Sequence, residues 1–189
     1  KTGTCKILIV TGCMAQRYKE EITEEIPEVD AVLGTTSYGD IVKALNEAEA
    51  GHVFQEFKDI NALPEDSGRR VITTGGHFGY LKIAEGCDKH CTYCIIPSLR
   101  GKFRSVPEER LLKQAEYMAS QGVRELILVA QETTVYGTDL YGKKTLHILL
   151  KKLCQIKGIR WIRVLYCYPE EIYDELIQTM KEEKKICHY

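Results

Sequence analysis

The chain has 189 residues, of which 44% are hydrophobic and 28% charged, a composition that is normal for a globular protein. Lys plus Arg total 26 and Asp plus Glu total 27, so the charge gives no overall attraction to nucleic acid or to an anionic membrane. Contact with nucleic acid is left open, but the apolar runs are far shorter than the ~20 residues that span a bilayer, so we expect no membrane segment.

The first region alternates strand and helix. Its expected elements are a strand at 5–10 (CKILIV), a helix from Ala15 to about Glu25, a strand at 30–34 (DAVLG), a helix cap at Thr35–Ser37 and a helix to about Ala50. This order predicts a parallel sheet covered by helices. The next residues, 55–79, lose the periodicity and are rich in Gly, Pro, Ser and Asp, which indicates a linker.

The second region repeats a strand-then-helix unit three times. The expected strands are 80–85 (YLKIAE), 125–130 (ELILVA) and 161–166 (WIRVLY), and ICHY (186–189) begins a fourth. The first helix follows a capping box of Ser105 and Glu108 with Pro107 in its first turn, and Pro169 opens the third helix. The strand 125–130 is a nearly continuous apolar run, which is typical of parallel strands buried on both faces.

The expected helices each carry an apolar stripe, and glycines follow two of them. The stripes are Leu111, Leu112, Ala115, Met118 and Ala119, closed by Gly122; Leu146, Leu149, Leu150, Leu153 and Ile156, closed by Gly158; and Ile172, Leu176, Ile177 and Met180. The fold class is therefore α/β. Three such units cannot close a barrel, so an open sheet and a barrel continued by further chain both fit. The start, KTGTCKILIV, lacks the long apolar region of a signal peptide. It also lacks an initiator Met, which suggests part of a longer protein.

Three of the eight cysteines stand close together. EGCDKHCTYCIIPSLRG (85–101) contains Cys87, Cys91 and Cys94 in a C-x3-C-x2-C pattern, which favours metal-binding thiols in an intracellular protein over disulfides. The group has three interpretations: buried core thiols, a zinc site completed by His90 or His77, or an iron–sulfur cluster with one iron left open. The loop follows the first strand of the second region, where α/β folds place active sites, and this favours the open cluster.

This spacing and placement resemble the radical S-adenosylmethionine (SAM) enzymes. The resemblance implies a 4Fe–4S cluster on Cys87, Cys91 and Cys94, with SAM on the open iron and a 5′-deoxyadenosyl radical formed by one-electron cleavage. It implies that Tyr93, just before the last cysteine, lies near the adenine of SAM. It also suggests that Gln131, at the end of the second strand, binds the amino acid part of SAM, with plain strand-end capping as the alternative.

Two further stretches resemble the methylthiotransferases of this superfamily: CIIPSLRGKFRS (94–105) and VTGCMAQRY (10–18). The resemblance implies a second 4Fe–4S cluster, bound by Cys13 and by two cysteines upstream of this sequence. It makes residues 1–54 the end of the domain that holds this cluster, 55–79 a linker, and 80–189 the first half of a partial TIM-type barrel. A Pro-containing linker is expected in that family where this chain has Gly75 and Gly76.

Three stretches are similar to the RimO-like branch of the methylthiotransferases: YLKIAEGC (80–87), LVAQETTVYGTDLYG (128–142) and LYCYPEEI (165–172). This branch modifies the β-carbon of an aspartate in a small-subunit ribosomal protein at the decoding centre. It implies a cytoplasmic enzyme with an electron donor such as flavodoxin or ferredoxin. The alternatives are the branch that modifies an adenosine of tRNA and, in a different class, a zinc-stabilised interaction module.

Several other side chains have open roles. Arg100 and Arg104 are candidates for holding a carboxylate of SAM or of the substrate, or are solvated loop arginines. Asp139 is open to a site role or a turn role, and Cys167 follows the third strand at the rim where a site contact is possible. Cys154 lies on the Leu-rich helical face and is expected in the core. No side chain is assigned as a catalytic acid or base.

Overall fold

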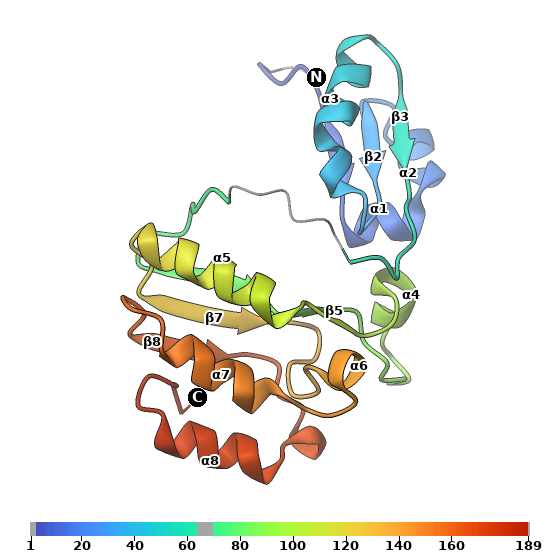
Figure 1. The fold of residues 1–189 in the computed structure, drawn as a ribbon. Coiled ribbons are helices and arrows are strands. Elements are labelled where there is room, and N and C mark those ends of the chain that lie inside the picture. Colours follow the sequence, from blue (N-terminus) through green and yellow to red (C-terminus); the bar gives the residue numbers. More distant parts are fainter. Residues whose placement is uncertain (1–2, 64–69, 189) are drawn as a thin grey trace. The chain divides into compact units, whose positions relative to one another are not determined.

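The computed structural model describes residues 3–63 and 70–188, which divide into two compact units (Figure 1). Unit 1 takes in the described part of Lys1–Gly68 together with Lys89–Gly101, and unit 2 consists of the remaining described residues. The cysteine loop is thus shared, because Cys87 belongs to unit 2 whereas Cys91 and Cys94 belong to unit 1. Residues 64–69 of the expected linker and the last residue of ICHY lie outside the described residues.

Unit 1 contains a parallel sheet of three short strands. The strands are β1 (Ile9–Thr11), β2 (Ala31–Leu33) and β3 (Phe54–Glu56), in the order β1-β2-β3. The central strand is fully buried, and its register places Ala31 beside both Ile9 and Phe54. The expected parallel arrangement is therefore confirmed, and β3 is an additional strand, because three residues are too few for alternation to stand out from a loop.

The helices of unit 1 differ from expectation at their starts. They are α1 (Cys13–Tyr18), α2 (Glu20–Glu25), the 3₁₀ turn η1 (Tyr38–Asp40), α3 (Ile41–Glu49) and α4 (Ile96–Arg100). A positive φ of 39° at Lys19 breaks the single helix expected over this stretch into α1 and α2. The expected cap at Thr35–Ser37 is wrong, since the Ser37 hydroxyl accepts from Lys58 N at 2.9 Å and α3 has no side-chain cap.

Unit 2 contains a second parallel sheet with helices on one face (Figure 1). The sheet has the order β4 (Phe78–Lys82), β7 (Glu125–Val129) and β8 (Trp161–Val164), and the covering helices are α5 (Glu108–Ser120), α7 (Leu146–Cys154) and α8 (Asp174–Glu182). A single parallel bridge joins Ile162 to Ile186, which agrees with the fourth strand expected at ICHY. No helix in the described residues is long and apolar enough to cross a membrane.

The remaining elements of unit 2 are short. They are the antiparallel pair β5 (Ala84–Glu85) and β6 (Arg104–Ser105), the helix α6 (Thr138–Tyr141) and the 3₁₀ turn η2 (Pro169–Glu171). The expected capping box is wrong, because α5 begins after Pro107 and the Ser105 side chain is bonded elsewhere. Gly122 (φ 97°) follows α5 as expected.

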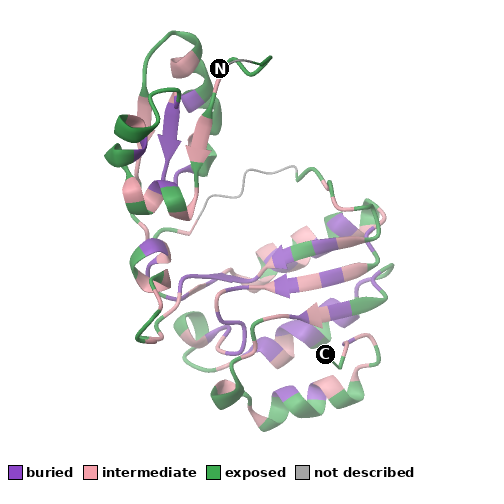
Figure 2. Ribbon diagram, turned by 180° about the vertical axis from the view of Figure 1, so that it is seen from behind, coloured by how far each residue is buried: buried purple, intermediate pink, exposed green. Residues whose placement is uncertain are grey.

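The core of unit 2 lies between its sheet and its helices. The buried side chains there are Leu81, Leu126, Leu128, Ile162 and Val164 of the strands and Leu111, Ala115, Met118, Leu146, Leu149, Leu150, Leu153 and Leu176 of the helices. The strands alternate between buried and more exposed residues (Figure 2), so the expected burial on both faces is wrong. The other face carries Tyr80, Trp161 and an ion pair of 2.9 Å between Arg163 Nε and Glu125 Oε1.

Candidate functional site

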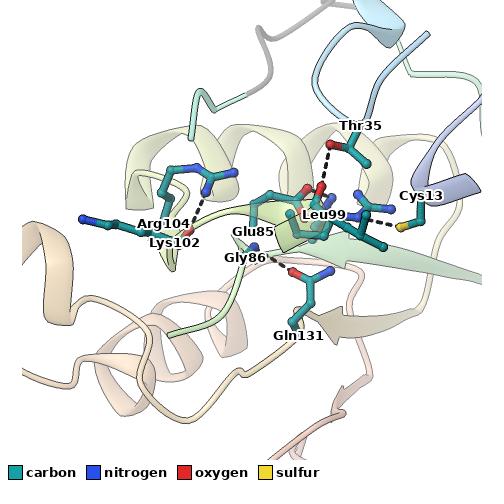
Figure 3. A network of polar contacts seen from close by, with 10 residues as sticks. Cys13, Thr35, Glu85, Gly86, Leu99, Lys102, Arg104 and Gln131 are labelled. Atoms are coloured by element: carbon teal, nitrogen blue, oxygen red, sulfur yellow. Dashed lines mark hydrogen bonds and ion pairs between the residues drawn. The ribbon is translucent and has the colours of Figure 1, made fainter. Parts of the chain in front are cut away.

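The carboxyl ends of the unit 2 strands meet at one edge of the sheet, and the cysteine loop begins there. After β4 the chain passes through β5 to Gly86, whose φ of 75° turns the backbone into the loop at Cys87. The Gly86 N–H donates to the side-chain oxygen of Gln131 at 2.9 Å (Figure 3). Gln131 follows β7, so its amide fixes the backbone immediately before Cys87. Its predicted contact with SAM stays a prediction.

Further contacts in unit 2 close the base of the cysteine loop. Asp88, next to Cys87, accepts a hydrogen bond from Phe103 N at 3.0 Å, and Glu85 pairs with Arg104 across the two-stranded β5–β6 sheet. Glu85 is buried and forms an ion pair with Lys82. These contacts therefore hold together the chain segment that enters the loop and the segment that leaves it.

Arg104 and Asp139 both have structural contacts in unit 2. Arg104 donates to the carbonyl oxygen of Lys102 (Figure 3). The Asp139 carboxylate accepts from Ser105 N at 2.8 Å and from Ser105 Oγ at 2.6 Å, and the same hydroxyl accepts from Gly137 N. Asp139 thus holds β6, the strand by which the chain leaves the loop. This is a structural role, made with a residue that is distant in the sequence.

The edge of the sheet continues at the end of β8. Tyr166 has a φ of 61°, which is rare for a residue with a side chain, and its carbonyl accepts from Thr133 N and Thr133 Oγ1. Cys167 follows with its sulfur 3.6 Å from the same hydroxyl, and it lines a groove of about 720 Å³ formed by β8 and α8. The structure therefore places Cys167 at the rim, where the sequence suggested it.

In unit 1, Cys91 and Cys94 lie on a turn in which Cys94 N donates to Cys91 O at 2.9 Å. Tyr93, between them, is 91% exposed, so its ring has room for a ligand to stack on it. The helix α4 begins two residues after Cys94. The stretch from Cys91 to Arg100 is therefore one turn followed directly by one short helix.

Cys13 begins α1, directly after β1, and its sulfur accepts a hydrogen bond from Arg100 Nε at 3.1 Å (Figure 3). In the same unit, Thr35 Oγ1 donates to Leu99 O at 2.9 Å. These contacts dock α4 on the carboxyl edge of the unit 1 sheet. The sequence motifs place Cys13 and Arg100 in separate stretches 87 residues apart, and no local pattern predicts that they touch.

The donor set fits an iron–sulfur cluster by its chemistry. All eight cysteines lie among the described residues and none is in a disulfide, and Cys13, Cys87, Cys91 and Cys94 are half-buried, as metal-binding thiols usually are. Within residues 3–63 and 70–188, no group of three or more His, Cys, Asp or Glu side chains is gathered as a metal site. The joining of the three loop thiolates on one cluster stays a prediction.

Comparisons with known proteins place this arrangement in a family. The chain is 63% identical over all 189 residues to the ribosomal protein uS12 methylthiotransferase RimO of Lachnoclostridium phytofermentans, and 52% identical to the RimO of Clostridioides difficile. It spans 43% of the length of each relative. A solved structure of the radical SAM methyltransferase TsrM from Kitasatospora setae matches 59% of this chain and 21% of its own, with 16% identity and a TM-score of 0.46.

The family model described as the radical SAM superfamily matches residues 81–189. That range is more than half of the chain and contains Cys87, Cys91 and Cys94. The chain belongs to the radical SAM superfamily.

Proposed function

We propose that the intact protein containing this chain is a methylthiotransferase that modifies the β-carbon of an aspartate in ribosomal protein uS12. The observation that carries this proposal is the 63% identity, over all 189 residues of the chain, to a protein named a ribosomal protein uS12 methylthiotransferase. The identity extends over the region of Cys13 as well as the cysteine loop, so it covers more than the features that all radical SAM enzymes have in common.

In this proposal the chain supplies ligands to two iron–sulfur clusters. Cys87, Cys91 and Cys94 would hold a 4Fe–4S cluster with SAM, and Cys13 would hold a second cluster with two cysteines from outside this sequence. When bound, these groups supply one-electron cleavage of SAM and a source of sulfur. Residues 80–189 would form the first half of a barrel, and an electron donor such as flavodoxin or ferredoxin would serve it.

The protein side chains then have the task of placement. Gln131 holds the backbone before Cys87, and Asp88 closes the base of the loop through Phe103. Exposed Tyr93 is assigned to the adenine of SAM. The aspartate β-carbon has no proton acidic enough for a side-chain base at ordinary pH, so a general base has no part in this scheme.

The substrate is tested by mass spectrometry of uS12 and of tRNA from a strain that lacks the intact gene. We expect uS12 to lose its methylthio group, tRNA to remain unchanged, and the plasmid-borne gene to restore the uS12 modification. Loss of a methylthio group from tRNA alone would instead identify a tRNA enzyme. Stoichiometric zinc without iron in the anaerobically purified protein would refute the radical chemistry altogether.

A further inference from the structure

We propose that Arg100 is a positioning residue for the second cluster, acting through the sulfur of Cys13. The inference rests on the proposed function in one respect, the assignment of Cys13 as a cluster ligand. Its basis in the structure is the hydrogen bond of 3.1 Å from Arg100 Nε to Cys13 Sγ, which connects two segments of unit 1 that are far apart in sequence.

A closed ring of contacts holds this hydrogen bond in place. Gln16 lies three residues after Cys13 on α1, and its side-chain oxygen accepts from Thr35 N at 3.1 Å. Thr35, which is only 2% exposed, donates from its hydroxyl to Leu99 O, and Leu99 precedes Arg100 on α4. The path therefore runs from α1 through Thr35 to α4 and returns to α1 at the cysteine.

Gly34 makes this approach possible. A Cβ added at Gly34 would lie 2.5 Å from the side-chain oxygen of Gln16, closer than any ordinary contact. Any larger residue here would push Gln16 away from Thr35. The ring thus depends on Gly34, on buried Thr35 and on Gln16. Gly34 leaves room for the Gln16 side chain, and Thr35 bonds to it.

Arg100 presents a donor and a positive charge to the Cys13 sulfur. A guanidinium stays protonated at all ordinary pH values, so it presents a fixed positive charge and an N–H donor to the sulfur. Hydrogen bonds and positive charge at a ligand sulfur stabilise the reduced, more negative cluster and raise its reduction potential. Arg100 should therefore orient Cys13 and make the second cluster easier to reduce.

The contact also lies close in sequence to one cysteine of the loop. α4 begins two residues after Cys94 and ends at Arg100, so this one short helix separates Cys94, the proposed ligand of the SAM cluster, from the contact to Cys13. Cys94 and Cys13 both belong to unit 1.

The test uses the intact protein, reconstituted anaerobically, with Cys87, Cys91 and Cys94 replaced by Ala so that only the second cluster remains. A redox titration followed by electron paramagnetic resonance gives its midpoint potential. We expect R100M to shift the reduction equilibrium about tenfold toward the oxidised form, a fall of ~59 mV for one electron, and R100K to recover part of it.

The matched control is R17M, which removes an arginine from the same helix as Cys13 whose guanidinium lies over the Tyr18 ring. Its potential should equal that of the parent. If R100M does not fold, R100Q keeps an N–H donor without the charge and should give a smaller fall. If R100M and R100Q bind the second cluster and its potential is unchanged, the role of Arg100 is overturned but the proposed function is not. A parent that binds no second cluster overturns the proposed function as well.

Discussion

The thiols of this chain differ in their burial. Cys154 is 4% exposed on the inner face of α7, and burial raises the pKa of its thiol from an ordinary 9.0 to about 11. The loop cysteines Cys87, Cys91 and Cys94 are only half-buried. Because the thiolate is the reactive form, the burial of Cys154 makes it a core residue without chemical function, as its position on the Leu-rich stripe predicted.

The raised pKa of Cys154 predicts how stability depends on pH. The folded state keeps the thiol protonated where the unfolded chain has already lost the proton, so this contribution is complete below pH 9 and is lost as the pH rises toward 11. Urea titrations at pH 8, 9 and 10 should show the free energy of unfolding falling across this range, and C154A should weaken that fall. Burial also raises the pKa of Tyr136, so the free energy of unfolding of C154A should still fall somewhat above pH 10. Equal pH dependence in both proteins would contradict the assignment.

Tyr166 carries backbone strain at the rim of the sheet. Its φ of 61° costs a residue with a Cβ about 1–2 kcal/mol, a cost that glycine does not have. We therefore expect Y166G to destabilise the protein by about 1–2 kcal/mol less than Y168G, since Tyr168 has an ordinary φ of −76°. Thermal and urea unfolding of the two variants measures this difference. An equal loss of stability in both would show that the turn at Tyr166 is not strained.

At the scale of elements, the exit from the cysteine loop depends on one buried group of hydrogen bonds. Ser105 gives both its N–H and its hydroxyl to the Asp139 carboxylate, and Gly137 N donates to the same hydroxyl. Removing the carboxylate would leave two buried donors of β6 without an acceptor. Such groups each cost about 1–3 kcal/mol.

A double-mutant cycle tests this group. D139A should lower the free energy of unfolding by about 2–3 kcal/mol, and S105A should add little to it, giving a coupling energy of about 1–2 kcal/mol. D174A is the matched control, because Asp174 also stands in the first turn of a helix but has no partner of this kind among its described contacts. Additive effects of S105A and D139A would show that the two side chains act independently.

Hydrogen bonds between residues distant in the chain explain which elements the sequence could predict and which it could not. The strands with long apolar runs, β4, β7 and β8, lie where the pattern put them, within two or three residues. The helix starts were less predictable, because Thr35 and Ser105 look like caps but bond to residues distant in the chain. Hydroxyl side chains satisfy local and distant partners equally well, so sequence spacing alone does not separate the two.

The sheet of unit 2 shows a second limit. A continuous apolar run predicted burial on both faces, yet only one face packs against helices, and the other carries Arg163 and Glu125 as an ion pair. On the face away from the helices, β7 carries Ile127 and Val129, but the register places Arg163 beside Ile127 and Lys82 beside Val129. The prediction failed because it used one strand, while the character of a face is set by all of its strands.

At the scale of the whole molecule, the cysteine loop belongs partly to each unit. The motif predicted the loop and its place at the end of a strand, and both are confirmed. The sequence did not predict that residues 89–101 pack with the segment around Cys13. That association depends on Arg100, Leu99 and Thr35, whose contacts appear only once the chain is folded.

The proposed division of labour between the two cysteine groups can be measured directly. The intact enzyme, prepared anaerobically, is supplied with SAM, a strong reductant and uS12, and both 5′-deoxyadenosine and methylthiolated uS12 are quantified for wild type, C91A and C13A. We expect both products from the wild type, neither from C91A, and 5′-deoxyadenosine without methylthiolated uS12 from C13A. Methylthiolation by C13A at the wild-type level, or SAM cleavage by C91A, would contradict this division of labour.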